Sequence, residues 1–268
     1  MKFYDTHMHS YLSFDSEEDP TAYLSKKTEV LTFTEHLDLD NTIFDKRDDI
    51  PDFDEIVKWQ SAFQNEHTID LLLGVEVGYV PGQEERLRSI LSSYDFDIKL
   101  LSCHQNDRYD YMDEETEDTP DEMMRRYVEQ LYKAVTTMTD CQIMTHFDYG
   151  FRVHDVTAEL FEAFKEPLKR VFKQAIENDF AFELNGKSIV KYGTIELYKW
   201  AIPTYIELGG TIFSLGSDAH NASEHFIGFA DMIALLEQHG VSKVALYKNQ
   251  ERYMVPLKTV KTYLEISE

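Results

Sequence analysis

The segment LLLGVEV, residues 71–77, decides the fold class of this chain. It is a short and nearly continuous run of leucine and valine, which is typical of a β-strand buried on both faces in a parallel sheet. The same run contains Glu76, whose carboxylate needs a partner there, because an unpaired buried charge costs several kcal/mol. The segment therefore predicts a helix-covered parallel sheet with a cation beside Glu76.

Similar apolar segments recur along the chain with longer mixed segments between them, which predicts strands connected by helices. We expect strands at 2–7, 30–36, 71–77, 97–104, 142–147, 180–185, 211–220 and 243–248. We expect helices at 20–28, 53–66, 83–93, 120–139, 157–178, 194–208 and 229–239. Thr119 and Pro120, followed by acidic residues, are typical of a helix start and support the fourth helix.

A single domain is the simplest organisation for these 268 residues. No internal repeat, low-complexity tract or Pro/Gly/Ser-rich linker divides the sequence. About seven successive units of a strand followed by a helix favour an α/β barrel, and single barrels have this length. We therefore expect one domain over residues 1–268, with parallel strands that close into a barrel.

The composition limits the partners of the protein. Fifty acidic and 26 basic residues give a formal net charge of −24, which repels nucleic acid phosphates unless cations reverse the field locally. Cys103 and Cys141 are the only cysteines, which favours a reducing compartment over a disulfide framework. Without an apolar leader or a membrane-spanning run, the sequence predicts a cytoplasmic protein that binds neither membranes nor nucleic acid, and it leaves the oligomeric state open.

Polar side chains stand near the carboxyl ends of the expected strands, which is where α/β barrels carry their chemistry. In DTHMHS, residues 5–10, His7 and His9 are two positions apart, so an extended backbone turns both imidazoles to the same side. Taken singly, each such residue is better explained as a cap, a surface group or a satisfied core side chain. The full set is His7, His9, Glu35, His36, Glu76, His104, His146, Asp218 and His220.

Convergence of these side chains would create a metal site. Imidazoles mixed with carboxylates suit Zn, Mn or Fe, whereas a cage made only of oxygen atoms would indicate Ca or Mg. A tetrahedral site takes about four ligands. A set of this size therefore indicates two or three divalent ions, with a carboxylate free to bridge them.

The motifs resemble those of the polymerase-and-histidinol-phosphatase (PHP) superfamily. In chain order they are DTHMHS, TEH with His36, VEVG with Glu76, SCH with His104, THFD with His146 and GSDAH with Asp218 and His220. The single-domain length, the TEH motif and the segment SFDSEED bring the chain closest to the histidinol-phosphate phosphatases of that superfamily. The resemblance implies a distorted (β/α)7 barrel that holds three metal ions.

The resemblance also implies a distribution of ligands among the ions. His7, His9, Glu76 and Asp218 would hold the first ion; Glu76 would bridge to a second ion held by His104 and His146; His36, His220 and a loop residue would hold the third. Many relatives have a histidine in that loop, whereas here Asp15 is the nearest matching position. A carboxylate there is chemically adequate, but the departure leaves the third ion's identity and occupancy open.

The implied activity is hydrolysis of L-histidinol phosphate to L-histidinol and phosphate, a step of histidine biosynthesis. Adjacent divalent ions lower the pKa of a bridging water, so hydroxide is available as the nucleophile near neutral pH. Asp218 or His220 would protonate the leaving alkoxide. Arg152, Lys187 and Asn185 follow expected strand ends and are candidates for substrate binding, although surface or turn roles explain them equally well.

Other functions stay open at this point. A PHP phosphoesterase could act on another small phosphomonoester, on a nucleotide or on a DNA end, although the net charge disfavours DNA. A barrel with every metal position filled would bind metals or partners without catalysis.

The remaining histidines and Cys103 have weaker signals. His154 and His225 lie in loops on the expected active face and contact either the substrate or nothing, whereas His67 and His239 lie away from strand ends. Cys103 precedes His104 and points the opposite way on an extended strand, so we expect it to pack against a helix.

Overall fold

The computed structural model describes residues 2–25, 27–113, 116–153 and 157–266. An eight-stranded sheet lies at its centre, with the order β3-β2-β4-β5-β6-β7-β8 and with β1 beside β4. The strands are β1 (Val30–Phe33), β2 (His36–Asn41), β3 (Arg47–Asp49), β4 (Asp70–Gly78), β5 (Ile98–Ser102), β6 (Ile143–Met144), β7 (Ala181–Asn185) and β8 (Phe213–Gly216). All neighbouring strands of this sheet are parallel except β2 and β3, as the continuous apolar run of β4 predicts.

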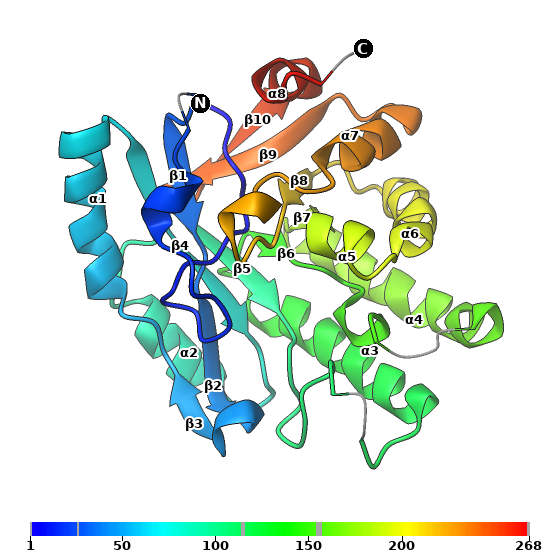
Figure 1. Cartoon of the computed structure of the whole chain (residues 1–268). Coiled ribbons are helices and arrows are strands. Elements are labelled where there is room, and N and C mark those ends of the chain that lie inside the picture. The colour runs from blue at the N-terminus through cyan, green and yellow to red at the C-terminus, as the bar shows by residue number, and fades with distance from the viewer. Residues whose placement is uncertain (1, 26, 114–115, 154–156, 267–268) are drawn as a thin grey trace.

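Helices surround these strands, with α3 and α4 side by side (Figure 1). The helices are α1 (Phe53–His67), α2 (Glu84–Leu91), α3 (Pro120–Thr137), α4 (Ala158–Glu177), α5 (Gly186–Val190), α6 (Ile195–Glu207), α7 (Phe229–Gln238) and α8 (Leu257–Leu264). Six of the seven helices predicted from the sequence are confirmed within two residues at each end. The start of α3 is the predicted one, because Thr119 and Glu122 form a capping box in front of Pro120.

The predicted helix at 20–28 is wrong. Only a short 3-10 turn, Pro20–Tyr23, forms there, and Leu24 already has an extended backbone. The backbone N–H of Ser25 then donates to the hydroxyl of Thr28, at 2.9 Å. This local side-chain bond replaces the helical one.

The predicted strand at 2–7 is also wrong. The backbone N–H groups of His7 and Ser217 both donate to the carboxylate of Asp5, so a side chain takes the place of a strand partner. The segment is nevertheless held on both sides, since Asp218 N–H donates to the carbonyl of His7 and Thr34 N–H donates to that of Met8, each at 2.8 Å. It thus lies between the ends of β8 and β1. These two strands do not pair with each other, so strand pairing alone does not close the sheet into a barrel.

The predicted strand at 30–36 is divided into β1 and β2, which run along β4 in one register. Val30 pairs with Asp70 and His36 pairs with Glu76. Thr34 and Glu35 interrupt the strand. The interruption lets the Glu35 carboxylate accept hydrogen bonds from the loop that follows His9.

The predicted strand at 243–248 forms, but outside the main sheet. It is β9 (Lys243–Lys248), which pairs antiparallel with β10 (Glu251–Pro256). Asn249 and Gln250 join them with φ values of 49° and 62°, which is typical of a type I′ turn. Tyr247 of β9 packs with Ile98 and Ile143 of the main sheet, and its backbone N–H and carbonyl both bond to the hydroxyl of Tyr4. The hairpin thereby covers the amino ends of the parallel strands.

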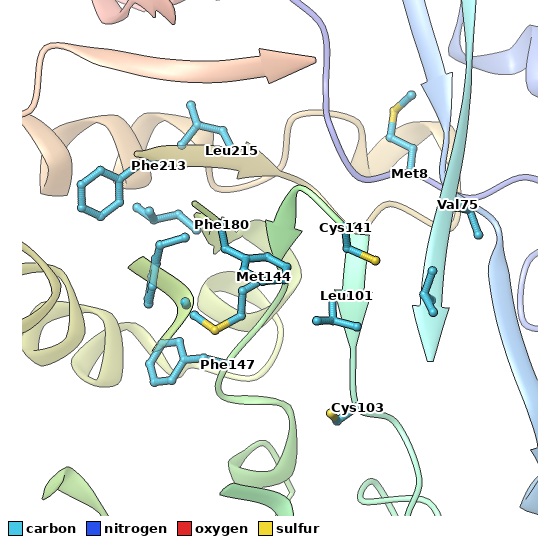
Figure 2. Close-up of a cluster of buried hydrophobic side chains, with 14 of the residues drawn as sticks. Met8, Val75, Leu101, Cys103, Cys141, Met144, Phe147, Phe180, Phe213 and Leu215 are labelled. Carbon is cyan, nitrogen blue, oxygen red and sulfur yellow. The ribbon is translucent and has the colours of Figure 1, made fainter. Parts of the chain in front are cut away.

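The two faces of β5 have different surroundings: one faces the small cluster and Glu76, and the other faces the large hydrophobic core. Leu100 packs in the same small cluster as Ile98, and the hydroxyl of Ser102 donates to Glu76. Leu101 and Cys103 belong instead to the large hydrophobic core (Figure 2). Cys103 thus lies on the face opposite His104, as predicted, and burial raises the pKa of its thiol.

Candidate metal centre

The side chains predicted as metal ligands converge at the carboxyl ends of the parallel strands. Glu76 lies near the end of β4 and His36 begins β2. His104 and His146 each follow the last residue of their strand by two positions, and Asp218 follows β8 in the same way. Because parallel strands end at one edge of a sheet, residues far apart in the sequence meet at this place.

Glu76 is the centre of the cluster, and its Oε1 atom faces β5 and β6. This oxygen lies 2.8 Å from Nε2 of His146 and 3.1 Å from Nε2 of His104. It also accepts a hydrogen bond from the hydroxyl of Ser102. All of these side chains are buried.

The Oε2 atom of Glu76 faces three further histidines of the centre, His7, His9 and His36. It lies 3.0 Å from Nδ1 of His36, 3.1 Å from Nε2 of His7 and 3.4 Å from Nε2 of His9. The rings of His9 and His36 are stacked, with centroids 4.2 Å apart. Glu76 therefore lies between the two histidines that follow β5 and β6 on one side and the histidines of the N-terminal segment and β2 on the other.

Asp218 and Asp15 complete the cluster on the side of the N-terminal loop. Oδ1 of Asp218 lies 3.6 Å from Nε2 of His9 and 3.5 Å from Nδ1 of His220. Nε2 of His220 lies 2.9 Å from one oxygen of Asp15, and the other oxygen lies 3.4 Å from Nε2 of His36. Asp15 thus stands between these two histidines, at the position where the resemblance called for a loop ligand.

Four buried atoms of the centre lack a hydrogen-bond partner among the described residues. They are Nε2 of His7, Nε2 of His9, Nδ1 of His36 and Oε2 of Glu76. Buried polar atoms are rarely left unsatisfied in folded proteins, and divalent cations beside these four would satisfy all of them. The mixed imidazole and carboxylate donors therefore fit Zn, Mn or Fe.

The ligand atoms form four compact groups of three, in each of which they lie within 4.8 Å of one another. The groups are His7, His9 and Glu76; His7, His146 and Asp218; His36, Glu76 and His104; and His9, His36 and His220. Several groups share members, which is the pattern of neighbouring ions with bridging ligands rather than of a single ion.

The carboxylates of the centre are held in their charged form. Burial alone would raise the pKa of Glu76, but His7 and His104 together keep it well below its usual value. Burial also acts to raise the pKa of Asp218, and Lys187 and His7 lower it further than burial raises it. Both side chains are thus available as anionic ligands.

Three buried carboxylates hydrogen-bond to the proposed ligands or to a residue that contacts them. Glu183 accepts a hydrogen bond from Nδ1 of His7, and Asp38 from Nδ1 of His104. Glu35 accepts hydrogen bonds from Ser10 and Ser13, and burial raises its pKa to about 7. Glu35 does not reach the ligand atoms directly, because Ser13 stands between it and His9.

Sequence reasoning missed Glu183 and Asp38. Glu183 carries the same signal as Glu76, an acidic residue inside the apolar strand FAFELN, and that signal could have identified it. Asp38 lies in HLDLDN, whose alternating pattern is that of an ordinary strand with one polar face. That pattern gives no indication of a buried carboxylate.

A cavity of about 250 Å³ opens over the centre. Its wall carries the basic side chains of Arg152 and Lys187 and the acidic side chains of Asp38 and Asp110. The apolar and aromatic side chains of the wall are Phe14, Ile43, Met112, Tyr149 and Tyr192. The cavity thus offers both cationic and acidic groups beside the proposed metal ligands.

Arg152 is fixed firmly in this wall. Its guanidinium lies 4.9 Å from the ring centres of both Tyr149 and Tyr192. It donates hydrogen bonds to Ser188 and, more weakly, to Asp218, at 3.4 Å. Lys187, by contrast, is partly exposed, with Nζ 2.9 Å from Nδ1 of His220.

The other predicted residues fall behind the cavity or away from it. Asn185 is fully buried, and its amide bonds Arg152, Glu183 and Asp218. His225 stacks on Phe226 and does not line the cavity. His154 lies outside the described residues. His67 and His239 are exposed near the ends of α1 and α7, away from the site as predicted.

The fold and the ligand cluster define a class, an α/β protein with a buried cluster of metal-ligating side chains that fits more than one ion. The family model described as the PHP domain matches residues 5–187. The chain belongs to the PHP domain family, and family and centre together make it a metal-dependent phosphoesterase.

Several known proteins are similar over almost the whole chain. A histidinol-phosphatase from Lactococcus lactis subsp. lactis is 24% identical over 261 residues, which are 94% of this chain and 96% of that protein. A probable histidinol-phosphatase from Clostridium acetobutylicum is 25% identical over 259 residues, which are 93% and 99% of the two chains.

The crystal structure of histidinol phosphate phosphatase from L. lactis, in complex with zinc, L-histidinol and phosphate, matches this fold with a TM-score of 0.81. It is 23% identical in sequence, and the match covers 94% of this chain and 99% of that one. The comparison confirms the predicted fold class. No helix among the described residues is long and apolar enough to cross a membrane.

Proposed function

We propose that this protein hydrolyses L-histidinol phosphate to L-histidinol and inorganic phosphate. The observation that carries the proposal is the cavity over the metal centre, whose wall contains Arg152 and Lys187 together with Asp38 and Asp110. Such a wall is complementary to a substrate with a phosphate at one end and a cationic amine at the other. The similar histidinol-phosphatases support the same substrate.

Two or three divalent ions, Zn, Mn or Fe, are the proposed cofactors. The proposed ligands are His7, His9, Asp15, His36, Glu76, His104, His146, Asp218 and His220. When bound, the ions would supply positive charge for the phosphoryl oxygens and a water of lowered pKa. Glu76 is the proposed bridging ligand, because its two oxygens face different sets of imidazoles.

Arg152 and Lys187 would bind and orient the phosphoryl group. The stacked tyrosines and Ser188 already hold the Arg152 guanidinium in one position, so little side-chain freedom is lost when an anion binds. Lys187 is partly exposed at the same wall and would place a second positive charge on the phosphate. Asn185 would act indirectly by holding the Arg152 guanidinium, since its amide oxygen accepts a hydrogen bond from Arg152.

Asp110 would bind the cationic end of the substrate. Its carboxylate lines the cavity and accepts hydrogen bonds from Met112 N–H and the hydroxyl of Tyr149. Burial raises its pKa to about 6, so the group is still mainly ionised at pH 7. Of the two candidates for protonating the leaving alkoxide, His220 is the proposed donor, because Asp218 is held in its charged form; both line the cavity.

A substrate panel tests the proposal. The purified protein, reconstituted with Mn or Zn, is assayed for phosphate release from L-histidinol phosphate, p-nitrophenyl phosphate, nucleoside monophosphates and single-stranded DNA. We expect kcat/KM for L-histidinol phosphate to exceed each of the others by about 100-fold, because the others lack a cationic group at the right distance from the phosphate.

The other outcomes separate the rival functions. Equal or better turnover of another phosphomonoester would refute the substrate while keeping the phosphoesterase class. Absence of any turnover in protein that has bound its ions would indicate a metal-binding barrel without catalysis.

A further inference from the structure

Two histidines of the metal centre each have a carboxylate at the ring nitrogen that points away from Glu76. Nδ1 of His7 lies 2.7 Å from Oε1 of Glu183, and Nδ1 of His104 lies 3.2 Å from both oxygens of Asp38. In both rings the opposite nitrogen, Nε2, lies 3.1 Å from Glu76. Each imidazole therefore has Glu76 at one ring nitrogen and a second carboxylate at the other.

We propose that Glu183 and Asp38 are positioning residues that select the tautomer of His7 and His104. A neutral imidazole has one N–H, and a carboxylate that accepts from Nδ1 keeps the proton on that atom. Nε2 is then left with its lone pair directed at the position of an ion, as a metal ligand requires. The inference rests on the metal centre proposed above.

The surroundings of Glu183 leave no place for a neutral substitute. The backbone N–H of His146 donates to its Oε2 atom at 2.9 Å, and the amide of Asn185 donates to the same atom at 3.1 Å. Oε1 accepts from His7, so both oxygens serve as acceptors. A glutamine at this position would point its NH₂ group either at Nδ1 of His7 or at the N–H groups of His146 and Asn185, all of which are donors.

Two strand glycines provide the space that these carboxylates occupy. A Cβ atom at Gly216 would lie 2.4 Å from Oε1 of Glu183, and one at Gly78 would lie 1.7 Å from Oδ1 of Asp38. Neither glycine has a positive φ, so the backbone does not require glycine there. We infer that these positions lack a side chain because the carboxylates pass over them to reach the histidines.

The first experiment measures metal binding rather than turnover. Zn²⁺ affinity is determined by competition with a chelator for the wild type and for Glu183→Gln. We expect a loss of about 10- to 100-fold in the variant. Ser214→Ala is the matched control, because Ser214 pairs with Glu183 in the sheet, is buried, and has a hydroxyl without a hydrogen-bond partner in the described chain. It should bind Zn²⁺ like the wild type.

Nitrogen NMR of the zinc-loaded protein reads the tautomers directly. In the wild type, His7 and His104 should carry hydrogen on Nδ1. Glu183→Gln should alter the signals of His7 and leave those of His104 unchanged, whereas Asp38→Asn should do the reverse. Unchanged affinity and unchanged tautomers in both variants would overturn the proposal.

A double-mutant cycle tests the role of the glycine. Gly78→Ala should weaken Zn²⁺ binding in the wild type by about 10-fold or more, but much less when Asp38→Ala has already removed the carboxylate. An equal loss in both backgrounds would mean that Gly78 serves the backbone alone. If Gly78→Ala does not fold, the tautomer measurement on Asp38→Asn still decides the role of Asp38.

These measurements use no substrate. A failure of L-histidinol phosphate hydrolysis would therefore leave them valid, and a failure of the positioning role would leave the substrate assignment intact.

Discussion

The Oε2 atom of Glu76 lies 3.1 Å from Nε2 of His7, and neither atom has a hydrogen-bond partner within the described part of the chain. Both side chains are fully buried. Leaving buried polar atoms unpaired costs about 1–3 kcal/mol for each group. A divalent cation beside the pair removes that cost, so binding of the ions and stability of the fold are expected to be coupled.

Replacement of Glu76 by glutamine should abolish this coupling. Zn²⁺ at about 100 times its Kd is expected to raise the free energy of unfolding of the wild type by about 2.7 kcal/mol. Glu76→Gln should show little of this gain, because the variant loses the charge that faces several imidazoles. Urea unfolding with and without metal measures the difference. Glu166→Gln, at an exposed position on α4, serves as the control; an undiminished gain in Glu76→Gln would contradict the prediction.

Replacement of Asp15 should affect one ion and leave the others in place. Asp15 contacts only His36 and His220 of the proposed ligands, at 3.4 and 2.9 Å. We expect Asp15→Ala to bind about one metal ion fewer per chain than the wild type. Asp15→His should retain it, because imidazole is also a suitable ligand. Elemental analysis after gel filtration gives the stoichiometry, and equal metal content in wild type and Asp15→Ala would rule out this role.

Replacement of Lys187 should weaken phosphate binding. Its ammonium lies at the cavity wall, 3.5 Å from Asp218, and Lys187→Met removes a positive charge that a phosphate would contact. We expect KM for the phosphate ester and Ki for inorganic phosphate to rise by roughly 10-fold. Lys191→Met is the control, because Lys191 pairs with Glu224 and does not line the cavity. Similar kinetics in both variants would argue against a phosphate contact by Lys187.

His225 should make the protein sensitive to acid. Burial lowers the pKa of His225 from 6.5 to about 4. Between these two pH values the imidazole is therefore protonated in the unfolded state and neutral in the folded state. The stability contributed by the neutral ring is complete above pH 6.5 and is lost as the pH falls toward 4. The loss between pH 7 and pH 5 should be about 2 kcal/mol smaller in His225→Phe than in the wild type.

The measurement for His225 is urea unfolding of metal-free protein at both pH values, so that acid release of metal does not contribute. Phenylalanine keeps the ring that stacks on Phe226. His239→Phe is the exposed control and should show the wild-type dependence on pH. An identical dependence in His225→Phe would refute the prediction.

Tyr4 should anchor the hairpin that covers the amino ends of the strands. Its hydroxyl donates to the carbonyl of Tyr247 and accepts from the N–H of the same residue, and burial raises its pKa so that it stays protonated. Tyr4→Phe leaves both backbone groups unpaired, which should cost about 1–3 kcal/mol for each group. Thermal unfolding measures the loss. Tyr253→Phe, on the exposed side of β10, should cost little.

Local patterns were sufficient to predict most of the helices and the strand that carries Glu76. The start of α3 has a cap, a proline and acidic residues together, and each signal acts within a few residues. The buried carboxylate of Glu76 was recognisable because its strand is otherwise apolar. Features of this kind depend on neighbours in the sequence and can be read from it.

Features that depend on distant partners could not be read in the same way. The segment before His7 has the composition of a strand, but the side chain of Asp5 bonds backbone groups that are 212 residues away as well as nearby ones. The pairing of Asp38 with His104 depends on the absence of a side chain at Gly78, on a different strand. Neither relationship leaves a periodic or compositional signal.

The placement of the N-terminal segment has a consequence for how the protein is made. His7 and His9 are made more than two hundred residues before their neighbours Asp218 and His220. A nascent chain without β8 presents an incomplete set of donors and an open edge where residues 6–9 belong. The proposed ligand set is therefore complete only after β8 and the residues that follow it are made, and we expect a product truncated before β8 to bind fewer metal ions than the full chain.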